Sequence, residues 1–227
     1  RFPRIPGDGG RVDSYGCPAR THVVPGAQVS KIVATAHPPR DVVAAFCTAA
    51  QTLEREGAVA LTSSCGFLVR IQHEIAAAVS IPVQLSALSL LPDLLAQEGV
   101  DCVGVVTAAR QALDAHALVA GGVAKDQAER LAIEGLEECA AFAQAILADG
   151  QELDQAGVEQ GVLAAVARLQ HRAPHLKTVV FECTNLPPYA QAVRAKTGLN
   201  VVSVLDVGNT LWESATRGKA SSVSCDG

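Results

Sequence analysis

The order of apolar segments along the chain predicts strands that alternate with helices. Short apolar runs, typical of buried strands, are followed by longer stretches in which apolar residues recur every three or four positions, as on one face of a helix. The predicted strands are residues 58–61, 81–83, 103–106, 177–181 and 200–205, and the predicted helices are 41–56, 67–79, 88–97, 127–147, 154–170 and 188–196. This alternation predicts an α/β fold with parallel strands, because parallel neighbours need a crossover connection. The tail from residue 218 is polar and predicted to be irregular.

A weak internal repeat places one cysteine in each half of the chain. In both copies a predicted strand leads into a cysteine, a helix follows, and a second strand closes the unit. Cys65 lies 17 positions before Pro82, and Cys183 lies 17 positions before Asn200. We interpret the copies as two βαβ units, each with a thiol at the carboxyl end of its first strand.

The repeat predicts two similar αβα domains with parallel sheets, related by a pseudo-twofold axis, with the active site at their interface. The first domain is expected over residues 1–90, with the C-terminal segment 206–227 packing back on it. The second is expected over residues 91–205.

The predicted position of both cysteines favours chemistry at a thiol. Ligands of open α/β sheets bind beyond the carboxyl ends of the strands, where the following helix directs its free N–H groups. A thiol placed there is expected to form a thiolate readily. Side chains that donate hydrogen bonds flank the two thiols: Ser63, Ser64, Thr184 and Asn185. Two such groups on opposite faces of a substrate suit proton removal and return at a stereocentre, so the sequence predicts a racemase or isomerase of a small carboxylate compound.

The segments around both cysteines resemble the two cysteine motifs of the aspartate/glutamate racemase family. The wider group includes hydantoin racemases, maleate isomerases and arylmalonate decarboxylases. The similar segments are residues 62–68 (TSSCGFL) and 182–189 (ECTNLPPY), with 1–8 and 23–27. The resemblance implies Cys65 and Cys183 as the catalytic pair, a site between two αβα domains, and neither a metal nor another cofactor.

The resemblance also implies which residues line the site. Asp8 is near the position of an acidic residue in these relatives, and Thr107 resembles a substrate-lining threonine. The full set expected to bind substrate is Asp8, Ser63, Ser64, Gly66, Phe67, Thr107, Thr184 and Asn185. Glu182 is expected to be structural, since neighbouring side chains on a strand point to opposite faces.

Departures from the family pattern leave the substrate open. Gly66 and Phe67 replace an Asn-Thr pair, and Asn185 replaces a histidine, which argues against glutamate or aspartate. Arylmalonate decarboxylases keep one cysteine, so retention of both favours racemisation or isomerisation. The alternatives are a hydantoin racemase, a maleate isomerase, a one-thiol reaction such as decarboxylation, or a small-molecule binding protein without turnover.

Composition argues against nucleic acid and membranes as partners, and leaves a small-molecule substrate as the expected partner. The net charge is −5 and the chain has no run of Lys or Arg, which argues against nucleic acid. No apolar run approaches the ~18 residues that span a bilayer, and residues 1–10 lack a signal-peptide core, so a cytoplasmic protein without membrane contact is expected. The seven cysteines form no CxxC pair, which predicts free thiols. By analogy with family members, a homodimer is expected.

Overall fold

The computed structural model describes residues 3–33 and 37–222, and its centre is a parallel sheet of four strands. The strands are β1 (Val103–Thr107), β2 (Leu131–Gly135), β3 (Thr178–Phe181) and β4 (Asn200–Val202). They run in the order β2-β1-β3-β4, and every neighbouring pair is parallel. The predicted α/β fold with parallel strands is confirmed.

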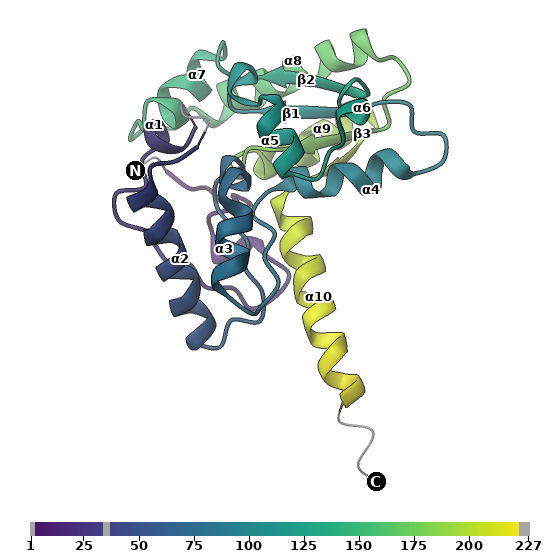
Figure 1. The fold of residues 1–227 in the computed structure, drawn as a ribbon. Coiled ribbons are helices and arrows are strands. Elements are labelled where there is room, and N and C mark those ends of the chain that lie inside the picture. The colour runs from purple at the N-terminus through teal and green to yellow at the C-terminus, as the bar shows by residue number, and fades with distance from the viewer. Residues whose placement is uncertain (1–2, 34–36, 223–227) are drawn as a thin grey trace.

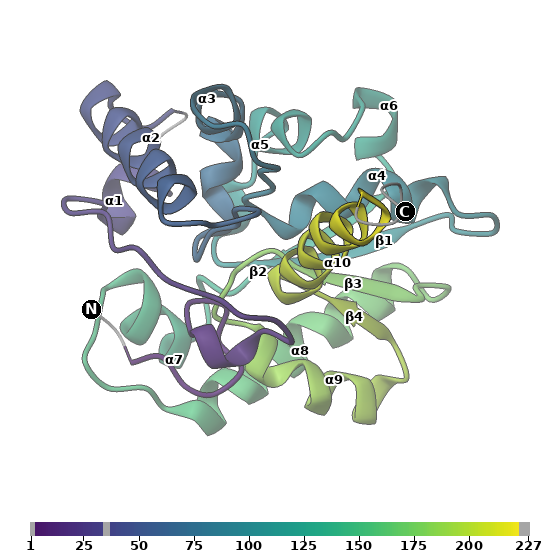
Figure 2. The ribbon, with the colours of Figure 1, turned by 90° about the horizontal axis from the view of Figure 1, so that it is seen from below.

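Helices cover both faces of this sheet. Helices α8 (Gln155–Arg172) and α9 (Ala190–Thr197) lie on one face, whereas α4 (Leu91–Ala96) and the 3₁₀ helix Ala87–Leu90 contact the other (Figures 1 and 2). All five residues of β1 are buried. A strand covered on both faces favours apolar residues on both, which explains the apolar run over residues 103–106 that precedes Thr107.

The remaining helices lie in both halves of the chain. They are α1 (Val29–Ile32), α2 (Arg40–Arg55), α3 (Gln72–Ala78), α5 (Ala115–Ala120), α6 (Lys125–Ala128), α7 (Ala140–Phe142) and α10 (Val204–Ser222), the 3₁₀ helices Val12–Ser14, Gly66–Ile71, Arg110–Ala112 and Pro187–Tyr189, and the π-helix Ala143–Leu147. Their ends follow local signals. The side chain of Asp154 accepts from the N–H of Gly157 at the start of α8, and Gly198 ends α9 with a φ of 71°.

The two cysteine-bearing units share one strand register. In the first unit Leu61 pairs with Val83 in a parallel bridge, and in the second Val179 pairs with Val201. Each residue of the second pair lies 118 positions after its counterpart, which is also the separation of the two cysteines. The cysteines therefore occupy equivalent positions in the two units, as the equal spacings predict.

The predicted helix over residues 127–147 is wrong. Strand β2 occupies residues 131–135 of this range and pairs with β1 along five positions. The segment is rich in Leu, Ala and Glu, which favour helices, but pairing beside a buried strand outweighs that local preference. Only α6, α7 and the short π-helix remain helical there.

Other predicted strands are shorter than expected. The strands at 58–61 and 81–83 reduce to the single bridge between Leu61 and Val83. The strand at 200–205 ends at Val202, and α10 begins two residues later. This helix continues to Ser222 where an irregular tail is expected, and residues 223–227 lie outside the described part.

Helix α10 extends away from the sheet (Figure 1) and contacts the first half of the chain. It packs on the 3₁₀ helix Ala87–Leu90, and Asn209 accepts from the N–H of Gly16 at 3.1 Å. None of the described helices, α10 included, has the length and hydropathy needed to cross a membrane. The domain boundaries at residues 90 and 205 and the cytoplasmic location stay predictions.

We expect Val105→Ala to destabilise the protein by about 2–3 kcal/mol, because it removes buried methyl groups and leaves a cavity at the centre of β1. Val119→Ala is the matched control, since Val119 in α5 is 51% exposed and should change stability by less than about 0.5 kcal/mol. Urea unfolding of both variants measures the difference. Equal stabilities would contradict the placement of β1 in the core.

Candidate active site

The two cysteines occupy equivalent positions in the two units and lie close enough for the charge of one to affect the pKa of the other. Cys65 directly precedes the 3₁₀ helix Gly66–Ile71, and Cys183 is two residues beyond β3. Cys65 keeps part of its surface exposed, whereas Cys183 is 7% exposed. A charge on Cys65 raises the pKa of Cys183, so a second thiolate is disfavoured once one has formed.

Both thiols are harder to ionise than expected from their positions. Burial, with the negative charge of Glu182, raises the pKa of Cys65 to about 12, although the N–H groups of Phe67 and Leu68 act in the opposite direction. Burial and Glu182 also raise the pKa of Cys183 well above its ordinary value. The expected lowering of the thiol pKa values is wrong for the free protein, because loss of water outweighs the backbone dipoles.

A chain of hydrogen bonds orients the second thiol. Cys183 Sγ donates to Asn185 Oδ1 at 3.6 Å, and Asn185 Nδ2 donates to Asp8 Oδ2 at 2.7 Å. The other carboxylate oxygen of Asp8 accepts from the N–H of Gly10 and from Arg4. Asp8 therefore holds the N-terminal turn against Asn185. The structure brings Asp8, Asn185 and Cys183 together, while their contact with substrate stays a prediction.

Three further predicted residues take part in hydrogen bonds at the cysteine turns, and one of these bonds joins the two turns. Thr184 Oγ1 donates to the carbonyl of Ser64 at 2.7 Å, across 120 positions of sequence. Ser63 Oγ donates to the carbonyl of Leu85 at 2.6 Å and accepts from the N–H of Cys65 at 3.2 Å. The side chains of Thr184 and Ser63 hold the backbone around the two thiols, and their contact with a substrate stays a prediction.

A fully buried carboxyl group lies between the two turns. Thr107 Oγ1 donates to Glu182 Oε2 at 2.8 Å, whereas Oε1 has no hydrogen-bond partner among the described residues. Oε1 lies against Gly66, where an added Cβ would be only 2.1 Å away. Burial raises the pKa of Glu182 to about 7, opposed by the Thr107 hydroxyl, the N–H of Ala108 and the charge of Arg70.

Glu182 is the residue whose importance the sequence analysis underrated. Its side chain accepts a hydrogen bond from Thr107, and the expected direction away from Cys183 stays a prediction. The available signal was an acidic residue directly after the buried apolar run of β3, since an ionisable group is rarely buried without a partner. Of the other predicted residues, Phe67 is 2% exposed in the core, and Arg70 lies over its ring at 5.9 Å.

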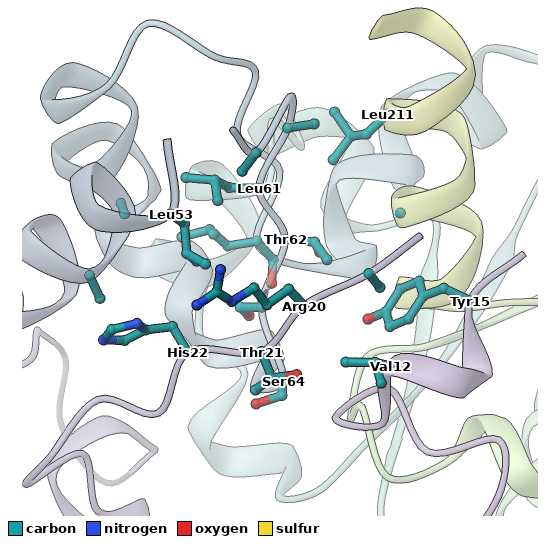
Figure 3. A pocket seen from close by; sticks show the side chains of 18 of the residues that line it. Val12, Tyr15, Arg20, Thr21, His22, Leu53, Leu61, Thr62, Ser64 and Leu211 are labelled. Carbon is teal, nitrogen blue, oxygen red and sulfur yellow. Dashed lines mark hydrogen bonds between the residues drawn. The ribbon is translucent and has the colours of Figure 1, made fainter. Parts of the chain in front are cut away.

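A pocket with a volume of about 450 Å³ lies next to the turn that carries Cys65. Neither cysteine lines it, but Thr62, Ser63 and Ser64, which precede Cys65, do. Figure 3 shows Arg20 and Thr21 at this pocket close to Thr62 and Ser64. A cavity of about 10 Å³ next to Asp8 and Asn185 has room for roughly one water molecule.

The six cysteines in the described part are all free thiols: Cys17, Cys47, Cys65, Cys102, Cys139 and Cys183. No cluster of three or more His, Cys, Asp or Glu side chains within the described ranges is placed to hold a metal ion.

Two kinds of known protein resemble this chain, and the sequence relatives are lyases. The chain is 32% identical over 206 residues to the dimethylsulfoniopropionate lyase of Durusdinium sp. clade D, a match that covers 88% of this chain and 67% of that protein. It is 29% identical over 219 residues to dimethylsulfoniopropionate lyase 3 of Emiliania huxleyi, covering 94% of this chain and 57% of the relative. No model of a known protein family matches the sequence.

The structural neighbours share the fold of the racemase group. A putative Asp/Glu racemase from Yersinia pestis superposes with a TM-score of 0.56 at 14% identity, covering 78% of this chain and 75% of its own. A glutamate racemase isoform from Bacillus anthracis gives 0.53 at 16% identity, covering 88% and 69%. Unliganded arylmalonate decarboxylase gives 0.51 at 16%, covering 79% and 77%. At these identities the likeness establishes the fold alone.

The expectation of a racemase or isomerase with a two-base mechanism is wrong. Sequence similarity is stronger to proteins named lyases than to any racemase reported above, and lyases break a bond rather than invert a centre. The resemblance to the aspartate/glutamate racemase family holds for the fold and not for the reaction. The expected alternative of a bond-cleaving reaction on the same scaffold agrees better with these relatives.

We expect Gly66→Ala to destabilise the protein by about 1–3 kcal/mol, because the new Cβ would be 2.1 Å from Glu182 Oε1 and 2.4 Å from its carbonyl oxygen. Gly16→Ala is the control, since its Cβ would meet Asn209 Oδ1 at an ordinary 3.4 Å. Urea unfolding compares the two variants. If Gly66→Ala proves no less stable than Gly16→Ala, the close approach of the two turns is incorrect.

The raised pKa of Glu182 predicts a specific dependence of stability on pH. The folded protein binds this proton up to about pH 7, whereas the unfolded chain releases it near 4.5. The stability linked to the proton is therefore complete below pH 4.5 and is lost as the pH rises through 7, by about 3 kcal/mol in all. Because Glu182→Gln cannot titrate, its stability relative to wild type should rise by that amount between about pH 4.5 and 8 in urea unfolding.

Glu134→Gln provides a control of opposite sign. Although burial opposes it, hydrogen bonds and charge from Arg168 and Arg172 lower the pKa of Glu134. The stability contributed by Glu134 is present above its unfolded pKa and lost in acid. The free energy of unfolding of Glu134→Gln relative to wild type should therefore fall as the pH rises. A Glu182→Gln variant that parallels wild type at every pH would contradict the buried, protonated carboxyl.

Proposed function

Because the chain belongs to the family of dimethylsulfoniopropionate lyases, we propose that it releases dimethyl sulfide from dimethylsulfoniopropionate or a closely related β-sulfonio carboxylate. The observation that carries the proposal is the 32% identity across 88% of the chain. The chain spans between 57% and 67% of the relatives described, so the activity is proposed for the part that it covers. The paired thiols supply a candidate base for the proposed reaction.

The proposed reaction is a base-catalysed elimination. A thiolate removes a proton from the carbon next to the carboxylate, and the electron pair of that C–H bond forms the new C=C bond. The bond between the β-carbon and sulfur breaks, and its electrons leave with sulfur. The products are neutral dimethyl sulfide, acrylate and a protonated thiol, which returns its proton to solvent. Charge and atoms balance without a redox partner.

This reaction needs one base and no acid at the leaving group. A sulfonium group departs as a neutral thioether, so no proton has to be delivered to it. Racemisation differs, since the second face of the carbon must receive a proton. A lyase on this scaffold can therefore use its two thiols unequally.

We assign the base to Cys65. The N–H groups of Phe67 and Leu68 favour its thiolate, and part of its surface is exposed. Cys183 is more deeply buried, and its proton is directed to Asn185 Oδ1. Cys183 therefore stays a thiol and positions the neighbouring turn, while Cys65 takes the substrate proton.

The positive charge of the substrate helps to form the thiolate. A permanent cation brought near a buried thiol favours its ionised form and lowers its pKa. The free protein then keeps an unreactive thiol, and the bound substrate generates its own base. The pocket of about 450 Å³, which reaches Ser64 beside Cys65, is the proposed path by which the substrate arrives.

We expect Cys65→Ser to lose at least about a thousandfold of dimethyl sulfide release, because a serine hydroxyl is a far weaker proton acceptor than a thiolate. Cys183→Ser should retain more activity, since serine can also donate to Asn185. Cys47→Ser, which changes a thiol in α2, is the control and should match wild type. Gas chromatography of dimethyl sulfide over purified enzyme measures all three.

The outcomes separate the parts of the proposal. No dimethyl sulfide from wild type, under conditions in which it is folded, rejects the lyase activity. Full activity of both Cys65→Ser and Cys183→Ser rejects thiol catalysis. An inactive Cys183→Ser beside an active Cys65→Ser reverses the assignment of the base.

A further inference from the structure

We propose that Glu182 is a positioning residue that keeps both thiols protonated and thereby sets the pH range in which the site reacts. The inference rests on one part of the proposed function, which is that a cysteine thiol serves as the base. Glu182 itself contacts neither the proposed base nor the substrate in this scheme, and it acts through its charge.

Geometry places this carboxyl group at the junction of the two cysteine turns. Glu182 precedes Cys183 in sequence, and its Oε1 lies against Gly66, the residue after Cys65. The side chain is 0% exposed, and its backbone N–H donates to the carbonyl of Val106 at 3.0 Å. A charge held there is not screened by water, so it acts on both thiols at once.

The groups around Glu182 leave its charge only partly balanced. From β1 and the residue after it, the hydroxyl of Thr107 and the N–H of Ala108 favour the carboxylate. From the 3₁₀ helix, Arg70 contributes a positive charge but is bound to Asp114 at 3.2 Å and to the carbonyl of Ala112. Both thiols lie near enough for the negative charge of Glu182 to raise their pKa values. Three acidic groups thus share one buried site, and only one of them is easily ionised.

The consequence is an ordered sequence of ionisation. Glu182 loses its proton first, and its charge then opposes a thiolate at Cys65 or Cys183. A substrate cation reverses this by compensating for the added negative charge. Without the carboxylate charge, the thiols would ionise and react at lower pH even in the absence of substrate.

The test is the pH dependence of thiol alkylation. Iodoacetamide is applied to wild type, Glu182→Gln, Glu182→Asp and Glu134→Gln from about pH 6 to 10, and mass spectrometry follows the peptides that contain Cys65 and Cys183. We expect Glu182→Gln to shift the alkylation profile of Cys65 to lower pH by about one unit, which is roughly a tenfold faster reaction at a given pH below the midpoint. Glu182→Asp retains the charge and should resemble wild type.

Glu134→Gln is the matched control, because it also removes a buried carboxylate. Glu134 lies on strand β2 and is paired with Arg168 and Arg172 of α8. It should leave the alkylation profile unchanged. In turnover, the acid limb of kcat/KM for dimethyl sulfide release should move with the alkylation profile of Glu182→Gln. If Glu182 had only a structural role, its substitution would change kcat/KM without shifting the acid limb of the pH profile.

An unchanged alkylation profile in folded Glu182→Gln overturns the inference. If that variant does not fold, Thr107→Val takes its place: loss of the hydroxyl raises the pKa of Glu182, leaves more of it neutral, and should shift the thiol profile in the same direction. An unshifted Thr107→Val would then overturn the inference. Alkylation needs no turnover, so a shifted profile with no release of dimethyl sulfide supports the role of Glu182 and rejects only the lyase activity.

Discussion

The close approach of Gly66 to Glu182 is the constraint on which the site depends. An added Cβ at Gly66 would meet the side chain and the carbonyl oxygen of Glu182 within 2.4 Å, so only glycine lets the turns meet. Each turn carries one cysteine, and this contact therefore fixes how near the two thiols lie. The hydrogen bond from Thr184 to the carbonyl of Ser64 joins the same turns a second time. Together they join segments that are about 118 positions apart in sequence.

That constraint also determines the electrostatics. Joining the turns encloses the Glu182 carboxyl, and enclosure raises the pKa values of Glu182, Cys65 and Cys183 together. Such a site is poorly suited to hold several negative charges without a counter-ion. A substrate that brings its own positive charge relieves this, whereas a purely anionic substrate would add to it. The arrangement therefore favours a zwitterionic carboxylate over a dicarboxylate such as maleate.

The sequence predicted the α/β fold class and the equivalent positions of the two cysteines, but not strand β2 or the electrostatic environment of the thiols. Equal spacings located Cys65 and Cys183 at equivalent strand ends, because a βαβ unit repeats its register wherever it recurs. Strand β2 was missed because its helix-favouring residues become a strand only beside β1, a contact remote in sequence. Likewise, a sequence gives no direct measure of water exclusion. The high thiol pKa values and the influence of Glu182 arise from burial, which depends on packing of the whole fold.

The likeness to racemases and the proposed elimination have a common chemical origin. Both reactions begin when a base removes the proton next to a carboxylate, and Cys65 is the proposed base of the elimination. The fate of the resulting electron pair depends on the substrate. If the β-carbon carries no leaving group, the carbanion must recover a proton, and a second acid on the opposite face makes inversion possible. If it carries a sulfonium group, the electrons leave with sulfur before a proton can return. The second thiol is then free to take another role, and the hydrogen bond of Cys183 to Asn185 fits a residue kept for position rather than for proton transfer.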